Sequence, residues 1–457
     1  MKRRVFRGLC CAAVGLMLTV LCLGGCKAPG GDPEGYDRLR RDGSGVSEPD
    51  NGPGFQEETP DGTKRREFIW DGSVELPPKE EGIYTLEEVL FAMLAQTDAD
   101  SNLLISPYSL RCVLTSLYHS TDGEAREEMA AFLGYDGSDE SVYEEQEALR
   151  REVLKGREGI ELSLADSFWI RETFGGESIA GRAKDLSDRL RERYGCEIFP
   201  TADFGDGTLE RMNGWVEEKT NGMIRRIVDS LDEETILVLM NALYFNGTWT
   251  TVFEPRDTQE RYFYGYKIEG EGETVPFMSL EDASFRYWEG EGYVALELPY
   301  GKDGEIVMDV ILAEGGTDLD YSELFSEGGE TLKKVLAGLD GAELADIYCL
   351  SIPKWEEDHT IAGLSEVFRA AGLENIFKSG GMSQISEWAR VDSILQKTAI
   401  EVTEHGTKAA AVSAVVTEGA GLITDEKFFI ADHNFAYVIR EKTEDTMLFV
   451  GLVNQLS

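Results

Sequence analysis

Apolar positions recur at helical spacing in the first half of the chain and in dense, strand-like runs in the second. The periodicity predicts helices over 86–94, over 109–118 and near 209–220. Runs rich in apolar and β-branched residues predict strands over 235–245, 293–298, 306–312, 345–352 and 447–453. Because helices come first and strands dominate later, the pattern predicts an α+β fold with a large, mainly antiparallel sheet system.

The first 25 residues have the composition of an export signal. Four basic residues precede residue 8, and an apolar stretch over 9–23 follows, which is too short to span a membrane comfortably as a mature helix. The next four residues, Leu23-Gly24-Gly25-Cys26, resemble a bacterial lipobox. We therefore expect a lipoprotein signal peptide at 1–25 and a lipid on Cys26; the alternative is ordinary cleavage that leaves a free cysteine.

Residues 26–82 are rich in Gly, Pro and acidic residues and cannot bury enough apolar surface to fold alone. They are predicted to form the lipidated Cys26 and a flexible acidic tether. An apolar island, Phe68-Ile69-Trp70, either makes no contact, as is usual in tethers, or docks on the domain. From 83 to 457 no second linker interrupts the pattern, which predicts one large domain.

The chain is strongly acidic, and its charge excludes one class of partner. With 44 Lys and Arg against 86 Asp and Glu, the net charge is −42, so no nucleic acid is expected as a partner. Beyond the signal and Cys26, the cysteines are Cys112, Cys196 and Cys349. Three distant cysteines form neither a disulfide framework nor a C-x-x-C metal site, so buried thiols are expected.

The motifs of common enzyme classes are absent from the sequence. The four histidines form no H-E-x-x-H pair, and there is no G-x-S-x-G elbow, no phosphate-binding loop and no dinucleotide fingerprint. With 86 acidic residues, neighbouring carboxylates arise by chance and carry no catalytic signal. The sequence predicts no enzyme, no metal and no cofactor; a secreted hydrolase that uses scattered carboxylates is the weakest alternative.

One uncharged stretch, AAAVSAVV at 409–416, is unusual in so charged a chain. By itself, such a stretch is more often a buried strand or helix. However, small residues alternate on one face, at Thr407, Ala409, Ala411, Ser413 and Val415, and no proline lies between 400 and 433. This pattern also suits a segment that must slide into an existing sheet without overpacking the core and with every N–H available for the ladder.

The region from 83 to the C-terminus resembles the serpins. The resemblance is carried by several specific segments that stand in the family's order: NLLISPYSL at 102–110, MNALYFNGTW at 240–249, VPFM at 275–278, ELPY at 297–300, IPK at 352–354, EVTEHGTKAAA at 401–411, FIADHNF at 429–435 and LFVG at 448–451. It implies the serpin fold, with three β-sheets, eight or nine helices and an exposed reactive loop.

The resemblance also implies a mechanism, in which a serine protease cleaves the loop and forms an acyl-enzyme. The loop then inserts into the main sheet and drags the protease with it, so the inhibitor is consumed and catalyses nothing itself. Serine proteases are the implied partners, and papain-like cysteine proteases are a further class. The hinge of the loop maps onto Glu404, Gly406, Thr407, Ala409, Ala410, Ala411 and Ser413. Lys408 and Val412 depart from the family pattern, and the alternation points both outward.

Counting about fourteen residues from the hinge glycine, as the family implies, places the reactive bond at Ala420-Gly421. Gly419 and Leu422 are the neighbouring alternatives if the loop length differs. A small residue before the cut suits elastase-like or subtilisin-like proteases with shallow pockets, and does not suit trypsin-like pockets.

The family's shutter, which holds two central strands together until insertion, maps onto Ser106, Ser109 and Asn241. The usual shutter histidine is replaced by Gln396, whose amide can still bond Asn241 but cannot change its charge with pH. Trp249 maps onto the breach where the loop enters; the alternative is a plain core aromatic.

These inferences predict an irreversible suicide-substrate inhibitor of serine proteases. It is expected to be a monomer that is attached to the membrane through its lipid only, on the cell surface or in the envelope, facing the extracellular or periplasmic side. The alternative is a non-inhibitory surface binding or adhesion lipoprotein with the same fold, which a bulky or proline-broken hinge would favour.

Overall fold

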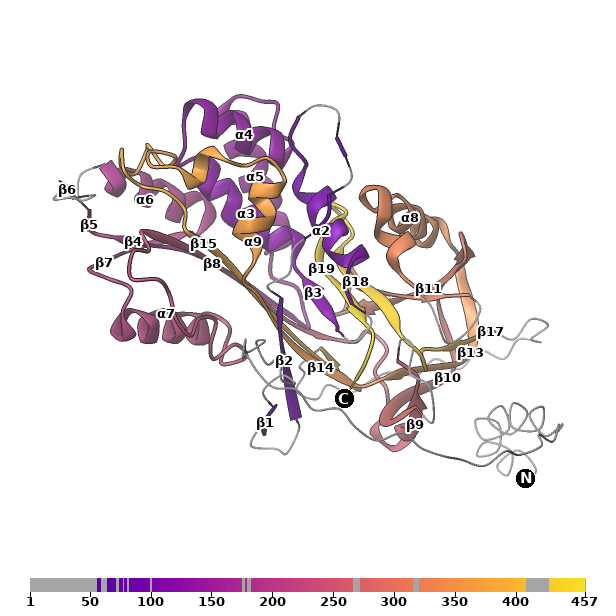
Figure 1. The fold of residues 1–457 in the computed structure, drawn as a ribbon. Helices are drawn as coiled ribbons and strands as arrows, with labels where there is room; N and C mark the ends of the chain where they lie inside the picture. The colour runs from indigo at the N-terminus through magenta and orange to yellow at the C-terminus, as the bar shows by residue number, and fades with distance from the viewer. Residues whose placement is uncertain are drawn as a thin grey trace, which may run out of the picture. The chain divides into compact units, whose positions relative to one another are not determined.

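The structure is a computed structural model (Figure 1) that describes residues 56–58, 64–70, 74–76, 78–79, 82–98, 101–174, 177–178, 182–265, 272–314, 320–407 and 427–456. This part of the chain contains eight α-helices: α2 (Leu86–Ala95), α3 (Pro107–Tyr118), α4 (Gly123–Leu133), α5 (Asp139–Val153), α6 (Arg182–Tyr194), α7 (Asp206–Lys219), α8 (Ser322–Gly341) and α9 (Leu364–Ala370). Short 3-10 helices lie at Pro255–Asp257 and Asn375–Phe377. Helix α8 is interrupted by non-helical backbone from Ser326 to Gly329, which is why eight or nine helices can be counted.

Capping residues in the sequence set where α2 and α3 begin. Thr85 forms a capping box with Glu88 at the start of α2. At α3, the Ser106 side chain accepts a hydrogen bond from the Ser109 N–H, and Pro107 occupies the first helical position. Helix α3 therefore begins two residues before the predicted start at 109, and its N-cap is Ser106.

The first large sheet has eight strands in the order β1-β2-β14-β15-β16-β8-β4-β7. Its members are β1 (Gln56–Glu58), β2 (Lys64–Trp70), β14 (Trp355–Ile361), β15 (Ser393–Thr403), β16 (Gly406–Thr407), β8 (Leu237–Thr248), β4 (Ile160–Arg171) and β7 (Glu197–Thr201). Strands β4 and β8 pair antiparallel along almost their whole length, whereas β8 and β15 are parallel.

The second large sheet has nine strands in the order β17-β13-β10-β11-β12-β18-β19-β3, with β9 added beside β10. Its members are β3 (Leu103–Ile105), β9 (Gln259–Phe263), β10 (Glu273–Gly290), β11 (Tyr293–Tyr300), β12 (Ile306–Ala313), β13 (Leu344–Pro353), β17 (Lys427–Ile430), β18 (Phe435–Glu441) and β19 (Thr446–Val453). A two-stranded sheet joins β5 (Thr173–Phe174) and β6 (Glu177–Ser178). The α+β class and the predicted strands are confirmed.

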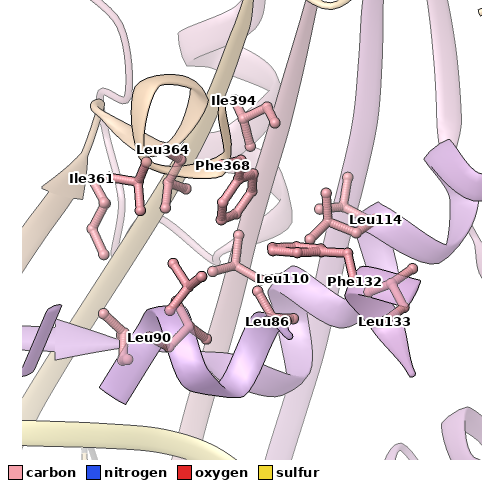
Figure 2. Close-up of a cluster of buried hydrophobic side chains, with 14 of the residues drawn as sticks. Leu86, Leu90, Leu110, Leu114, Phe132, Leu133, Ile361, Leu364, Phe368 and Ile394 are labelled. Carbon is pink, nitrogen blue, oxygen red and sulfur yellow. The ribbon is translucent and has the colours of Figure 1, made fainter. Parts of the chain in front are cut away.

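Helices cover both faces of the eight-stranded sheet. Figure 1 shows α7 on one face, beside β4 and β7, and α3, α5, α6 and α9 above the other. The core on the second side is formed by leucine and phenylalanine side chains of α2, α3, α4 and α9, which pack against Ile361 of β14 and Ile394 of β15 (Figure 2). Burying such side chains contributes about 1.5–3 kcal/mol each, so this layer holds the sheet and the helices together.

Two strands lie within 26–82, for which the sequence predicts a flexible tether. Strand β2 pairs parallel with β14, with Phe68 opposite His359 and Trp70 opposite Ile361, and β1 pairs with β2. The apolar island therefore belongs to β2, which lies between β14 and the edge strand β1 of the eight-stranded sheet. The domain limits themselves stay a prediction, and among the described residues no helix is long and apolar enough to cross a membrane.

Candidate functional site

The centre of the eight-stranded sheet contains a parallel pairing that we call the seam, formed by residues 238–243 of β8 and 393–398 of β15. Beyond the seam, the chain turns back after β15 and the two-residue strand β16 enters between the same two strands. Gly406 lies opposite Thr403 and Thr248, and Thr407 lies opposite Val402 and Gly247. The first hinge residues are thus already part of the sheet.

Glycine is required where β16 enters. Gly406 has φ 137°, a backbone conformation that L side chains rarely adopt. A Cβ atom on Gly406 would also lie 2.0 Å from the carbonyl oxygen of Gly247. The close approach of these two glycine backbones is therefore what admits the hinge.

Thr407 is fully buried, as the small-residue alternation predicts for the inward face. Its Oγ1 lies 2.7 Å from the hydroxyl of the buried Tyr300. Trp249 stacks on Tyr300 with ring centroids 4.2 Å apart, and its Nε1 donates to the Thr403 carbonyl at 2.9 Å. Trp249 is both a core aromatic and a direct contact of the turn that carries the hinge.

Glu404 fixes the start of this turn. Its carboxylate accepts a hydrogen bond from Thr258 Oγ1 at 2.7 Å and pairs with Lys354 Nζ at 2.9 Å. Burial by itself would raise the pKa of Glu404, but the hydrogen bonds and the Lys354 ammonium lower it overall. Glu404 is therefore ionised at neutral pH, and through Lys354 it anchors the hinge to the connection between β13 and β14.

The four predicted shutter residues form one buried hydrogen-bond network beneath the seam. Asn241 Oδ1 accepts from Ser109 Oγ at 2.6 Å and from Gln396 Nε2 at 3.1 Å. Gln396 also donates to the Ser106 carbonyl at 3.0 Å and accepts from the Ser106 N–H at 3.1 Å. The Gln396 amide thus joins β15 to both α3 and β8, and the role of this network as a latch stays a prediction.

Asp166, which no sequence motif singles out, belongs to the same network. Asp166 is buried on β4 directly opposite Asn241, and its Oδ1 accepts from Asn241 Nδ2 at 2.6 Å. Burial raises the pKa of Asp166 to about 7, against the lowering effects of Arg150 and of this hydrogen bond. A carboxyl inside the apolar run 164–170 was the available signal.

Several predicted site residues lie outside the described residues. These are the remaining hinge positions, the reactive bond and the lipidation site: Ala409, Ala410, Ala411, Ser413, Ala420, Gly421 and Cys26. The three cysteines of the domain, Cys112, Cys196 and Cys349, are buried, as expected.

Among the described residues, one group of carboxylates could geometrically hold a cation, formed by Glu152, Glu305 and Glu441. Basic side chains already neutralise it. Lys155 Nζ lies 2.8 Å from Glu305, and Arg157 lies 2.9 Å from both Glu305 and Glu441. We therefore interpret this group as an ion-pair network.

Comparison with known proteins agrees with this architecture. A family model described as Serpin (serine protease inhibitor) matches residues 87–456. Serpin-Z2A of Triticum aestivum is 30% identical over 389 residues, covering 78% of this chain and 90% of that protein. Plasminogen activator inhibitor 1 of Neovison vison is 29% identical over 384 residues, covering 80% and 90%. The crystal structure of tengpin, a thermophilic serpin in the native state, matches with a TM-score of 0.70 at 26% identity, covering 88% of this chain and 100% of tengpin.

Proposed function

Because the chain belongs to the serpin family, whose members are generally protease inhibitors rather than enzymes, we propose that it is a suicide-substrate inhibitor of serine proteases. In this proposal a protease cleaves the reactive loop and forms an acyl-enzyme. The loop then continues from β16 down the seam, and the protease is trapped before it can deacylate. The serpin fold that the sequence predicts provides the sheet for this insertion.

The observation that carries the proposal is the entry of Gly406 and Thr407 between β15 and β8. Strand β16 is antiparallel to both neighbours, whereas the seam below it is parallel. Extension of β16 would therefore replace one parallel pairing by two antiparallel ones, which are slightly more stable per residue. It would also bury each small inward-facing residue. Insertion therefore lowers the free energy of the protein once the loop is cut.

The preference of the inhibitor follows from the residues around the proposed reactive bond. Ala420 would enter the primary pocket of the protease, and a methyl group fits the shallow pockets of elastase-like and subtilisin-like enzymes. Papain-like cysteine proteases, which also form acyl-enzymes, are a second proposed class. Attachment through a lipid on Cys26 would place the inhibitor at the cell surface or envelope, where it meets exported proteases as a monomer.

The experiment mixes the purified protein with pancreatic elastase and with subtilisin. The test protein lacks residues 1–25 and carries Cys26→Ser, so that it retains β1 and β2. A band at the summed mass that survives denaturant, with a released C-terminal peptide that begins at Gly421, supports the proposal. Cleavage without any complex by either protease would overturn the trapping step.

Two adjacent substitutions provide a matched control for loop insertion. By the alternation of small residues, Ala411 faces the core of the inserted strand and Val412 faces away from it. Ala411→Glu should abolish the covalent complex and leave a cleaved inhibitor, because the new carboxylate would be buried beneath the sheet. Val412→Glu should keep most of the complex; equal effects of the two substitutions would reject the predicted register.

A further inference from the structure

The carboxyl of Asp166 completes a row of three polar side chains across three strands. Asp166 on β4 lies directly opposite Asn241 on β8, and Asn241 lies directly opposite Gln396 on β15. Oδ1 of Asp166 is bonded to Asn241 at 2.6 Å. Its other oxygen, Oδ2, is buried and has no hydrogen-bond partner among the described residues. A buried carboxyl with one unsatisfied oxygen is costly when it is ionised.

The titratable groups that face Asp166 come from three neighbouring parts of the chain. Tyr108 and Cys112 come from α3, Arg150 from α5, and Cys196 from the connection between α6 and β7. Burial raises the pKa of Cys112 to about 12 and raises those of Tyr108 and Cys196 well above their usual values. These three groups stay neutral near pH 7, which leaves Arg150 as the charged neighbour that acts on Asp166.

We propose that Asp166 is a positioning residue for the shutter: its protonated form keeps Asn241 joined to Gln396, and loss of the proton loosens the seam and speeds loop insertion. The effect on inhibition rests on the proposed function, but the opening of the seam does not. Gln396, which replaces the family's histidine, cannot change its charge with pH. The shutter of this chain is nevertheless sensitive to pH, through the carboxyl of Asp166 on the other side of Asn241.

The direction of the effect follows from proton linkage. Burial holds the pKa of Asp166 near 7 in the closed sheet, far above the usual value of 3.8. Opening of the seam lets water reach the unsatisfied oxygen, so the pKa falls toward its usual value in the open state. Since the closed state binds the proton more tightly, low pH favours closure and rising pH favours opening. For full hydration in the open state, the opening constant rises about tenfold from pH 6 to pH 8.

Hydrogen exchange of the protein without any protease tests this directly. The measured quantity is the opening constant of the backbone amides at 238–243 and 393–398, corrected for the intrinsic pH dependence of exchange, between pH 5.5 and 8.5. The amides of β11 and β12 serve as an internal reference. We expect an increase of about tenfold between pH 6 and pH 8 in the seam, and no such increase in β11 and β12.

Three variants separate positioning from simple structural support. Asp166→Asn keeps the shape and should give a flat pH profile. Arg150→Gln removes the facing cation and should move the midpoint to higher pH, whereas Arg151→Gln, an exposed change on the same helix, should leave the midpoint in place. If Asp166→Asn does not fold, the proposal is still tested by the midpoints of Arg150→Gln, which should shift, and Arg151→Gln, which should not.

A flat profile in the unsubstituted protein, or a midpoint that Arg150→Gln does not move, would overturn the proposal. Persistence of the full pH dependence in Asp166→Asn would also overturn it. Because no protease enters these measurements, failure of the elastase and subtilisin experiment would count against the proposed function alone.

Discussion

Substitution of Thr407 by arginine tests whether the hinge must be buried for inhibition. Thr407 is 0% exposed, and its hydroxyl is bonded to Tyr300 inside the sheet. An arginine there would bring a guanidinium without a counter-charge into the core beside Tyr300. A buried unpaired ion costs several kcal/mol. Before cleavage, the two-residue strand β16 can leave the sheet and expose this ion to water, whereas an inserted strand holds the ion in the core, so the cost falls on insertion. Even about 3 kcal/mol in the barrier slows a step roughly 150-fold.

Such slowing should change the products of the reaction, because insertion competes with hydrolysis of the acyl-enzyme. The assay is the stoichiometry of inhibition, read from the fraction of Thr407→Arg that runs as covalent complex or as cleaved inhibitor on denaturing gels. We expect almost only cleaved inhibitor. Thr407→Val is the matched control: it leaves the Tyr300 hydroxyl without its partner, at a cost of about 1–3 kcal/mol. This cost applies before and after insertion, so trapping should persist. A wild-type stoichiometry in Thr407→Arg would refute the reasoning.

Three further predictions concern the loop, the entry point and the sheet edge. Ala420→Arg should redirect inhibition toward trypsin-like proteases; mapping of the cut elsewhere by mass spectrometry would reject the assigned bond. Gly406→Ala should expel β16, because the added Cβ would clash with the Gly247 carbonyl, and should change the fluorescence of Trp249, whereas an unchanged spectrum would contradict the entry geometry. Deletion of residues 1–71, which removes β1 and β2, should lower the thermal unfolding temperature relative to deletion of 1–54; equal temperatures would show that the two strands contribute nothing.

The sequence predicts much of the fold, because helix and strand periodicities are local properties. The predicted helix at 86–94 and the strand at 293–298 agree closely with α2 and β11. The position of β2 could not be predicted in this way. Its pairing depends on the free edge of β14, a strand about 290 residues later in the chain, and three apolar residues in a polar segment do not identify a partner.

In the candidate site, too, some features could be predicted from the sequence and others could not. The shutter residues are separated by up to 290 positions in the chain, so the resemblance to a family, and not any local pattern, brings Ser106 and Gln396 together. Asp166 carried a local signal, a carboxyl within the mostly apolar run 164–170, but only the cross-strand register with Asn241 shows what it contacts. The depth to which Thr407 enters the sheet depends on backbone contacts that no sequence pattern describes.

The central claim is that the reactive loop inserts along the seam after it is cut. The most direct measurement is a crystal structure of the protein after cleavage of its reactive loop. The account predicts that β16, which begins at Gly406, extends between β8 and β15, and that the parallel pairing of Leu239 with Ile394 is lost. A cleaved protein in which β8 and β15 remain directly paired would contradict it.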